Sequence, residues 1–222
     1  MPASCGDNMI DAYIKLLVLM YADDTIIMSS TKEGLQKAIN QMCRYCKTWN
    51  LKMNSDKTKV TVFGQQKREM KNHTFFCNGQ ELETVQSFKY LGIVFSCNGS
   101  YKVALEDLYS RASRAMFALL AKCRKFDLPI DIRLELFDRL VTPIMLYACE
   151  VWGFDKAATL EKLHLKFLKY TLKVKMSTCS NMVYGELGRF PLYIDIKKKM
   201  IGYWANLLNG KDTKYSNVQL LV

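Results

Sequence analysis

The chain has 222 residues, half of them apolar, which suffices for a sizeable core and is typical of a globular protein. Its net charge of +11 favours phosphate-rich partners, so nucleic acid is the first candidate partner, although many soluble proteins are basic without binding it. Eight scattered cysteines without an evident secretory signal favour an intracellular setting, nuclear or cytoplasmic. The most apolar run, residues 14–20, is shorter than the ~20 residues that span a bilayer, so no membrane anchor is indicated.

Residues 13–30 predict two short apolar strands around the polar turn Ala22-Asp23-Asp24, a buried hairpin with acid at its tip. A helix is expected directly afterwards, because Ser30 and Glu33 have capping-box spacing and apolar residues then recur at helical intervals. The apolar stripe of this predicted helix consists of Leu35, Ala38, Ile39, Met42, Cys46 and Trp49.

Strand signals follow that helix. Lys59 to Phe63 alternates polar and apolar residues, as a half-buried strand does. Residues 75–77 and 81–85 flank Asn78-Gly79, the strongest short hairpin signal, and one more strand is expected over 88–95.

From about residue 100 the pattern becomes helical. Pro129 separates the first two predicted helices, and Pro143 lies inside the second, where it predicts a kink. Further helices are expected over 157–175 and about 193–208. The sequence therefore predicts an α+β fold up to about residue 97 and an all-α region beyond it.

The adjacent carboxylates Asp23 and Asp24 carry the first chemical signal. A divalent metal would neutralise two charges placed beside apolar strands. On extended backbone neighbouring side chains point to opposite sides, so the two aspartates are not expected to be equivalent. An ordinary Asp-rich turn explains a bare pair more simply, but Tyr21 and Ala22 before the pair, and the capped helix after it, favour a functional turn.

This arrangement resembles the catalytic hairpin of reverse transcriptases, whose signature is an aromatic residue, a variable residue and two aspartates at a β-turn. Residues 49–54 (WNLKMN) with 57–59 (KTK) look like the segment after the palm helix of retrotransposon enzymes, and residues 88–92 (FKYLG) look like their primer-grip hairpin. The helical remainder, with residues 143–153 and 184–191, is similar to the thumb and following segment of non-LTR (LINE-type) elements.

The resemblance covers nearly the whole chain. It implies a partial polymerase palm of antiparallel hairpins plus a helix, followed by an all-α, thumb-like region. The implied domains are the C-terminal part of the palm over 1–97, the thumb over 98–176 and a helical C-terminal extension over 177–222. The implied partners are an RNA template, a DNA primer and deoxynucleoside triphosphates, as an RNA-directed DNA polymerase requires.

The resemblance also implies roles for matched residues. Asp23 would bind catalytic Mg²⁺ (or Mn²⁺) directly, with Asp24 as its less essential neighbour, in a two-metal site for nucleotidyl transfer to a primer 3′-hydroxyl. Lys57 would approach the incoming triphosphate, although a lysine solvated in a loop is an equal explanation. Three residues would form the primer grip, where a glycine lets backbone come close to the primer strand. They are Tyr90, Leu91 and Gly92.

Independently of the resemblance, four lysines recur at steps of four, three and four on the helix predicted over 157–175, beside an apolar stripe. Such a basic stripe can follow a nucleic-acid backbone through phosphate contacts, and a solvated helix face is the open alternative. The four are Lys162, Lys166, Lys169 and Lys173.

Cys43 and Cys46 have metal-ligand spacing, but a zinc site needs about four ligands, so packing within one helical turn is favoured. In reverse transcriptases another metal-binding aspartate comes from an earlier palm strand, and Asp7 and Asp11 are poor substitutes for it. We therefore expect an incomplete metal site and a chain that is inactive alone. The rival functions are a non-catalytic nucleic-acid-binding retrotransposon remnant and a related palm enzyme such as an intron maturase.

Overall fold

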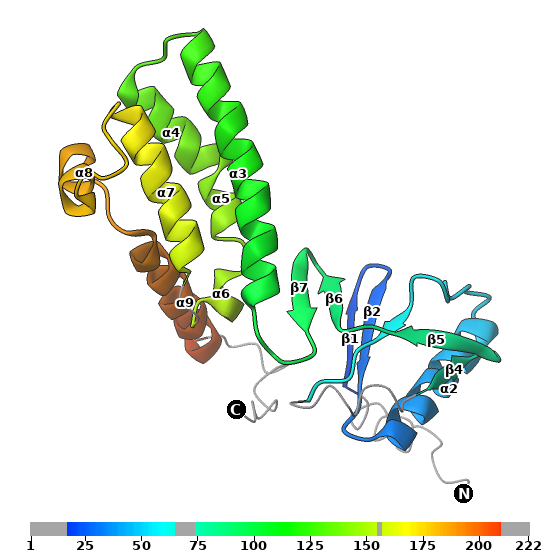
Figure 1. Cartoon of the computed structure of the whole chain (residues 1–222). Helices are drawn as coiled ribbons and strands as arrows, with labels where there is room; N and C mark the ends of the chain where they lie inside the picture. Colours follow the sequence, from blue (N-terminus) through cyan, green and yellow to red (C-terminus); the bar gives the residue numbers. More distant parts are fainter. Residues whose placement is uncertain (1–16, 65–73, 155–156, 210–222) are drawn as a thin grey trace, which may run out of the picture. The chain divides into compact units, whose positions relative to one another are not determined.

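The computed structural model describes residues 17–64, 74–154 and 157–209 (Figure 1). The chain forms two compact units. The first extends to Phe88 and includes Ser96–Gly99, and the second consists of Lys89–Phe95 and the chain from Ser100 onward. Within the described ranges the first unit combines strands with a helix and the second is mainly helical, so the predicted α+β class is confirmed.

The first unit opens with a hairpin of β1 (Leu17–Tyr21) and β2 (Asp24–Met28), paired antiparallel with Tyr21 opposite Asp24. The loop is thus two residues long, and Ala22 at φ +53° has the left-handed conformation that such loops require. The predicted hairpin exists, but its predicted burial is wrong: Met20 and Tyr21 are 63% and 64% exposed. A two-stranded ribbon cannot cover both of its own faces.

Helix α2 (Lys32–Thr48) follows the hairpin, as predicted. Its N-cap is Thr31, whose hydroxyl accepts a hydrogen bond from the Gly34 N–H at 3.1 Å, so the predicted cap at Ser30 is wrong by one residue. The helix buries Ala38, Ile39, Cys43 and Cys46. Trp49 lies past its end and is 65% exposed, so it does not extend the apolar stripe.

A small three-stranded sheet packs on α2. Its strands are β3 (Lys59–Val60), β4 (Phe75–Cys77) and β5 (Gln80–Thr84), in the order β3-β5-β4. The β4–β5 hairpin turns at Asn78-Gly79, both at positive φ, as predicted. Strand β3 is shorter than the predicted run to Phe63 because it pairs with β5 only at Lys59 and Val60.

The outer edge of β4 is covered by a side chain of α2. The Gln36 amide donates to the Phe76 carbonyl at 2.7 Å and accepts from the Phe76 N–H at 2.9 Å. This pairing satisfies backbone groups that an open edge strand would leave exposed. Beneath it lies the core of the unit, made of Ile39, Cys43, Val60, Phe75, Cys77 and Leu82.

The segment predicted as one strand over 88–95 is instead a hairpin of β6 (Ser87–Tyr90) and β7 (Ile93–Ser96). The chain reverses at Leu91 and Gly92, with φ of +45° and +83°. Apolar content alone did not distinguish a strand from two short strands with a tight turn. The turn falls within the segment that resembles a primer-grip hairpin.

The second unit is built on the long helix α3 (Lys102–Lys125), against which α4 (Ile130–Leu140), α5 (Thr142–Met145) and α7 (Ala158–Thr171) pack (Figure 1). Helices α6 (Cys149–Trp152), α8 (Ser180–Leu187) and α9 (Leu192–Asn209) complete it. Its largest fully buried side chains include Trp152, Phe137, Phe167 and Leu108. None of the helices within the described ranges has both the length and the apolarity that crossing a membrane requires.

Two helix boundaries differ from prediction. The kink expected at Pro143 is a full break, since α4 ends at Leu140 and Pro143 lies in the first turn of α5, where its missing N–H costs no hydrogen bond. Helix α7 ends at Thr171 rather than at 175, because Lys173 adopts a left-handed φ of +56°.

Candidate functional site

The two aspartates lie at the tip of the β1–β2 hairpin. Asp23 occupies the turn, and Asp24 is the first residue of β2. The two therefore have different backbone settings. Both are exposed, so water can hydrate these carboxylates and the pair needs no cation to offset burial. The same exposure leaves two hard oxygen donors open to a divalent cation.

The described part of the chain contains no group of three or more His, Cys, Asp or Glu side chains arranged to hold a metal. Cys43 and Cys46 are both buried in the core, as the packing interpretation expected. Asp7 and Asp11 lie outside the described residues. The tip thus offers two carboxylates, and no described side chain joins them as a third ligand.

Lys57 lies in a loop that is organised by Asn54. The Asn54 side-chain oxygen accepts the N–H groups of Asp56 and Lys57 at 3.1 and 3.2 Å, which is a local side-chain-to-backbone turn. The Lys57 side chain is exposed. Within the described residues no hydrogen bond or ion pair joins it to the two aspartates, so its approach to a triphosphate stays a prediction.

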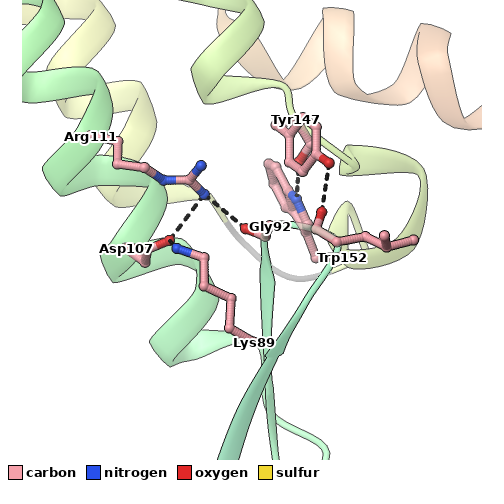
Figure 2. Close-up of polar contacts among 7 residues, drawn as sticks. Lys89, Gly92, Asp107, Arg111, Tyr147 and Trp152 are labelled. Atoms are coloured by element: carbon pink, nitrogen blue, oxygen red, sulfur yellow. Dashed lines mark hydrogen bonds and ion pairs between the residues drawn. The ribbon is translucent and has the colours of Figure 1, made fainter. Parts of the chain in front are cut away.

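The β6–β7 turn is fastened to the helical unit through its two backbone carbonyls (Figure 2). The Tyr147 hydroxyl donates to the Leu91 carbonyl oxygen at 2.6 Å, and the Arg111 guanidinium donates to the Gly92 carbonyl oxygen at 3.0 Å. A Cβ at Gly92 would lie 3.2 Å from the Tyr147 ring, so glycine allows the ring to lie against the turn. The close approach expected at Gly92 is thus made, within the chain, by Tyr147.

Both anchoring residues are themselves held by neighbours. The Asp107 carboxylate accepts from Arg111 at 3.0 Å and from Lys89 on β6 at 3.2 Å, which links α3 to the hairpin (Figure 2). The indole N–H of the fully buried Trp152 donates to the Tyr147 carbonyl at 2.8 Å. Tyr147 is therefore tied to the core of the helical unit.

Sequence reasoning missed Arg111, Asp107 and Tyr147. A glycine in a strand-like segment marks a close approach by some partner, so Gly92 gave a signal. That signal does not say which residue approaches. Arg111 and Asp107 read as ordinary polar positions of a helix.

The four lysines do not form one exposed stripe. Lys169 is 8% exposed, and its ammonium donates to the Met176 carbonyl at 2.7 Å. Lys173 lies beyond the end of α7. Lys162 is exposed, and the Lys166 ammonium lies 4.8 Å from the centre of the Phe117 ring on α3. The predicted stripe fails at Lys169 because the chain after α7 folds back onto that lysine.

Helices α3 and α7, which pack against each other, are nevertheless both basic. Together they carry nine Lys and Arg residues and three acidic residues, Glu106, Asp107 and Glu161. Lys166 also lies 5.9 Å from the centre of the Tyr170 ring, so an ammonium is flanked by two half-exposed aromatic rings. We call this face the α3–α7 surface; it comprises Arg114, Phe117, Lys162, Lys166 and Tyr170.

Comparison with known proteins gives a consistent result. Residues 5–95 match the family model of the reverse transcriptase (RNA-dependent DNA polymerase) family. A transposon-derived protein of Caenorhabditis elegans is 21% identical over 214 residues, which cover 90% of this chain and 74% of that protein. The RNA-directed DNA polymerase from mobile element jockey of Drosophila funebris is 23% identical over 169 residues, covering 72% of this chain and 18% of the polymerase.

A third relative, an RNA-directed DNA polymerase from transposon BS of Drosophila melanogaster, is 24% identical over 161 residues, 68% of this chain and 17% of the polymerase. The chain thus spans less than a fifth of the length of either polymerase. No solved structure matches the chain. Together these matches confirm the resemblance to reverse transcriptases of non-LTR (LINE-type) retrotransposons.

Proposed function

We propose that the chain is part of an RNA-directed DNA polymerase of a non-LTR retrotransposon, and that the Asp23-Asp24 turn serves nucleotidyl transfer to a primer 3′-hydroxyl. One observation carries the proposal. The segment that matches the reverse transcriptase family holds Tyr21 to Asp24 on a two-residue hairpin turn, with both carboxylates exposed at its tip.

The donor set at this tip fits part of a Mg²⁺ or Mn²⁺ site, because carboxylate oxygens are the ligands that these hard cations prefer. Asp23 would bind the metal directly, and Asp24 would support or share it. When bound, paired ions of this kind stabilise the charges on the attacking hydroxyl and the leaving pyrophosphate. The 222 residues alone are expected to be inactive, because no third described ligand accompanies the pair.

The other matched residues would bind the substrates. Lys57 has an exposed ammonium on an ordered turn, where it can offset negative charge on an incoming deoxynucleoside triphosphate. The turn of Tyr90, Leu91 and Gly92 would meet the primer strand. These roles rest on the family resemblance and, for Lys57 and Leu91, on their exposure.

The α3–α7 surface would hold the RNA template and DNA primer through phosphate contacts, which need positive charge but no base sequence. Lys162 and Lys166 are the lysines available for this role, together with Lys173 beyond the end of α7. Lys169 is a weaker candidate because its ammonium already binds the Met176 carbonyl. These substrates belong to the nucleus or cytoplasm, where we propose that the protein acts.

Binding is tested with the purified chain and an RNA–DNA hybrid that has a recessed primer 3′ end, followed by fluorescence anisotropy. With three phosphate contacts, affinity is expected to fall about 40-fold between 50 and 200 mM salt. Replacing Lys162 and Lys166 by Ser should weaken binding, and Asp23→Asn should not. Salt-independent binding, or no binding, would contradict the proposed nucleic-acid role.

Chemistry is tested in a chimera in which this chain replaces the matching segment of the jockey polymerase. Primer extension with Mg²⁺ is expected, and Asp23→Asn should reduce it by at least about 100-fold, as loss of a metal ligand does. Asp131→Asn on α4 is the matched control and should leave extension unchanged. A chimera that melts cooperatively yet extends no primer, or extends equally after Asp23→Asn, would refute the catalytic role.

A second candidate function is a non-catalytic nucleic-acid-binding retrotransposon remnant. The concentration of positive charge on α3 and α7 favours it, since that surface needs no metal to bind phosphate. It predicts the same salt-dependent binding and an inactive chimera. The extension assay therefore separates the two functions.

A further inference from the structure

Tyr147 and Arg111 hold the β6–β7 turn by its backbone rather than by its side chains. They donate hydrogen bonds to the carbonyl oxygens of Leu91 and Gly92, the two residues at which the chain reverses (Figure 2). We propose that Tyr147 and Arg111 are positioning residues that fix this turn, and thereby the part of the protein that meets the primer terminus. The proposal rests on the proposed polymerase function.

A two-residue turn on a two-stranded hairpin has little stability of its own, so its position depends on what it packs against. Here Ile93, just after the turn, is buried in the core of the helical unit. The two contacts to the carbonyl groups then orient the turn, because a hydroxyl and a planar guanidinium donate good hydrogen bonds only over a limited range of angles. Together they fix both the place and the tilt of the turn.

The anchors are fixed in turn by the helical unit. Trp152 holds the backbone of Tyr147 just before Ala148, which adopts a left-handed φ of +51° and reverses the chain into α6. Asp107 holds Arg111 four residues along α3 and also binds Lys89 on the hairpin. The position of the turn is therefore set by helices. A group that aligns the reacting end of a primer needs a fixed position of this kind.

The contacts also determine how the turn can meet a primer. Because its two carbonyl oxygens point to Tyr147 and Arg111, other groups of the turn must face the primer strand. The Leu91 side chain, 39% exposed, is one such group. The anchors thus act on the primer through the turn and do not touch it themselves.

The experiment uses the whole chain bound to an RNA–DNA hybrid whose primer ends in photoreactive 4-thiothymidine. Crosslinks are mapped by mass spectrometry, and amide hydrogen exchange is measured at residues 91–93. In wild type, the terminal nucleotide should crosslink to residues 90–92. Tyr147→Phe and Arg111→Met should each raise the rate of amide exchange at the turn about tenfold, because each removes one strong hydrogen bond. Each should also lower the yield of this crosslink by a similar factor.

Total affinity for the hybrid should stay within about twofold in these variants, because phosphate contacts elsewhere dominate it. Tyr193→Phe and Arg139→Met, which alter exposed residues of α9 and α4, are the matched controls and should change neither readout. Arg111→Lys keeps a donor and should restore part of the crosslink. If Arg111→Met fails to fold, Tyr147→Phe, which removes a single oxygen atom, still decides the question.

Raised exchange with an unchanged crosslink would overturn the proposal, since the turn would then be loosened without effect on the primer. A wild-type chain that binds the hybrid without crosslinking at residues 90–92 would also overturn it, yet would leave the nucleic-acid role standing. A chain that binds no hybrid at all contradicts the proposed function itself. The three failures are thus distinguishable.

Discussion

Lys169 provides a direct test of how the structure divides the four lysines. Replacing it by Met keeps most of the buried stem and removes the ammonium that donates to the Met176 carbonyl at 2.7 Å. A hydrogen bond to a charged group contributes about 1.5–3 kcal/mol to stability. Met176 is half-exposed, so water can reach that segment and the lower end of the range applies. We expect Lys169→Met to lower the free energy of unfolding of the helical unit by about 1.5 kcal/mol.

The matched control is Lys162→Met, which removes the same charge from an exposed position of the same helix. Urea unfolding followed by circular dichroism should show a lower midpoint for Lys169→Met and a free energy of unfolding within about 0.5 kcal/mol of wild type for Lys162→Met. Hybrid binding should weaken more in Lys162→Met than in Lys169→Met. Equal stabilities for the two variants would refute the structural role of Lys169. A larger loss of hybrid binding in Lys169→Met than in Lys162→Met would show that Lys169 itself contacts nucleic acid.

Two further predictions concern titrating groups. Burial alone would raise the pKa of Glu161, but two neighbours more than offset this and hold it below the ordinary 4.5. They are the His164 imidazole, whose Nδ1 lies 3.5 Å from the carboxylate, and the Tyr184 hydroxyl, which donates a hydrogen bond to it. The ionised form is thus favoured in the folded state. Its stabilising contribution is present above about pH 4.5 and is lost as pH falls through the lower folded-state pKa, so Glu161→Gln should flatten thermal stability against pH there. Burial raises the pKa of Cys77 to about 12, so iodoacetamide at pH 8 should modify the exposed Cys179 first and Cys77 only on unfolding, as peptide mass spectrometry would show. Alkylation of both at one rate in the folded protein would contradict this.

The sequence predicted best what depends on neighbouring residues. The Asn78-Gly79 hairpin and helix α2 follow from local conformational preference and from 3.6-residue periodicity, and both are present. The missing N–H of proline located a distortion at Pro143 as well, although a kink was predicted and the structure has a full break. Prediction failed where burial was inferred from composition. The β1–β2 strands are apolar, yet a hairpin with no described third strand stays exposed.

The two turns of the candidate site differ in the same way, in how far they depend on residues near them in the sequence. The Tyr21 to Asp24 turn is formed entirely by its own hairpin, since every pair in its register joins residues at most 11 positions apart. The β6–β7 turn instead takes its donors from residues 19 and 56 positions away in the chain. Local pattern therefore located the first turn correctly and gave only Gly92 as a hint of the second. For the same reason, substitutions that alter the first turn should lie within it, whereas the second should respond to changes throughout α3 and the segment around Tyr147. Mutational sensitivity confined to residues 87–96 would show that the hairpin positions itself.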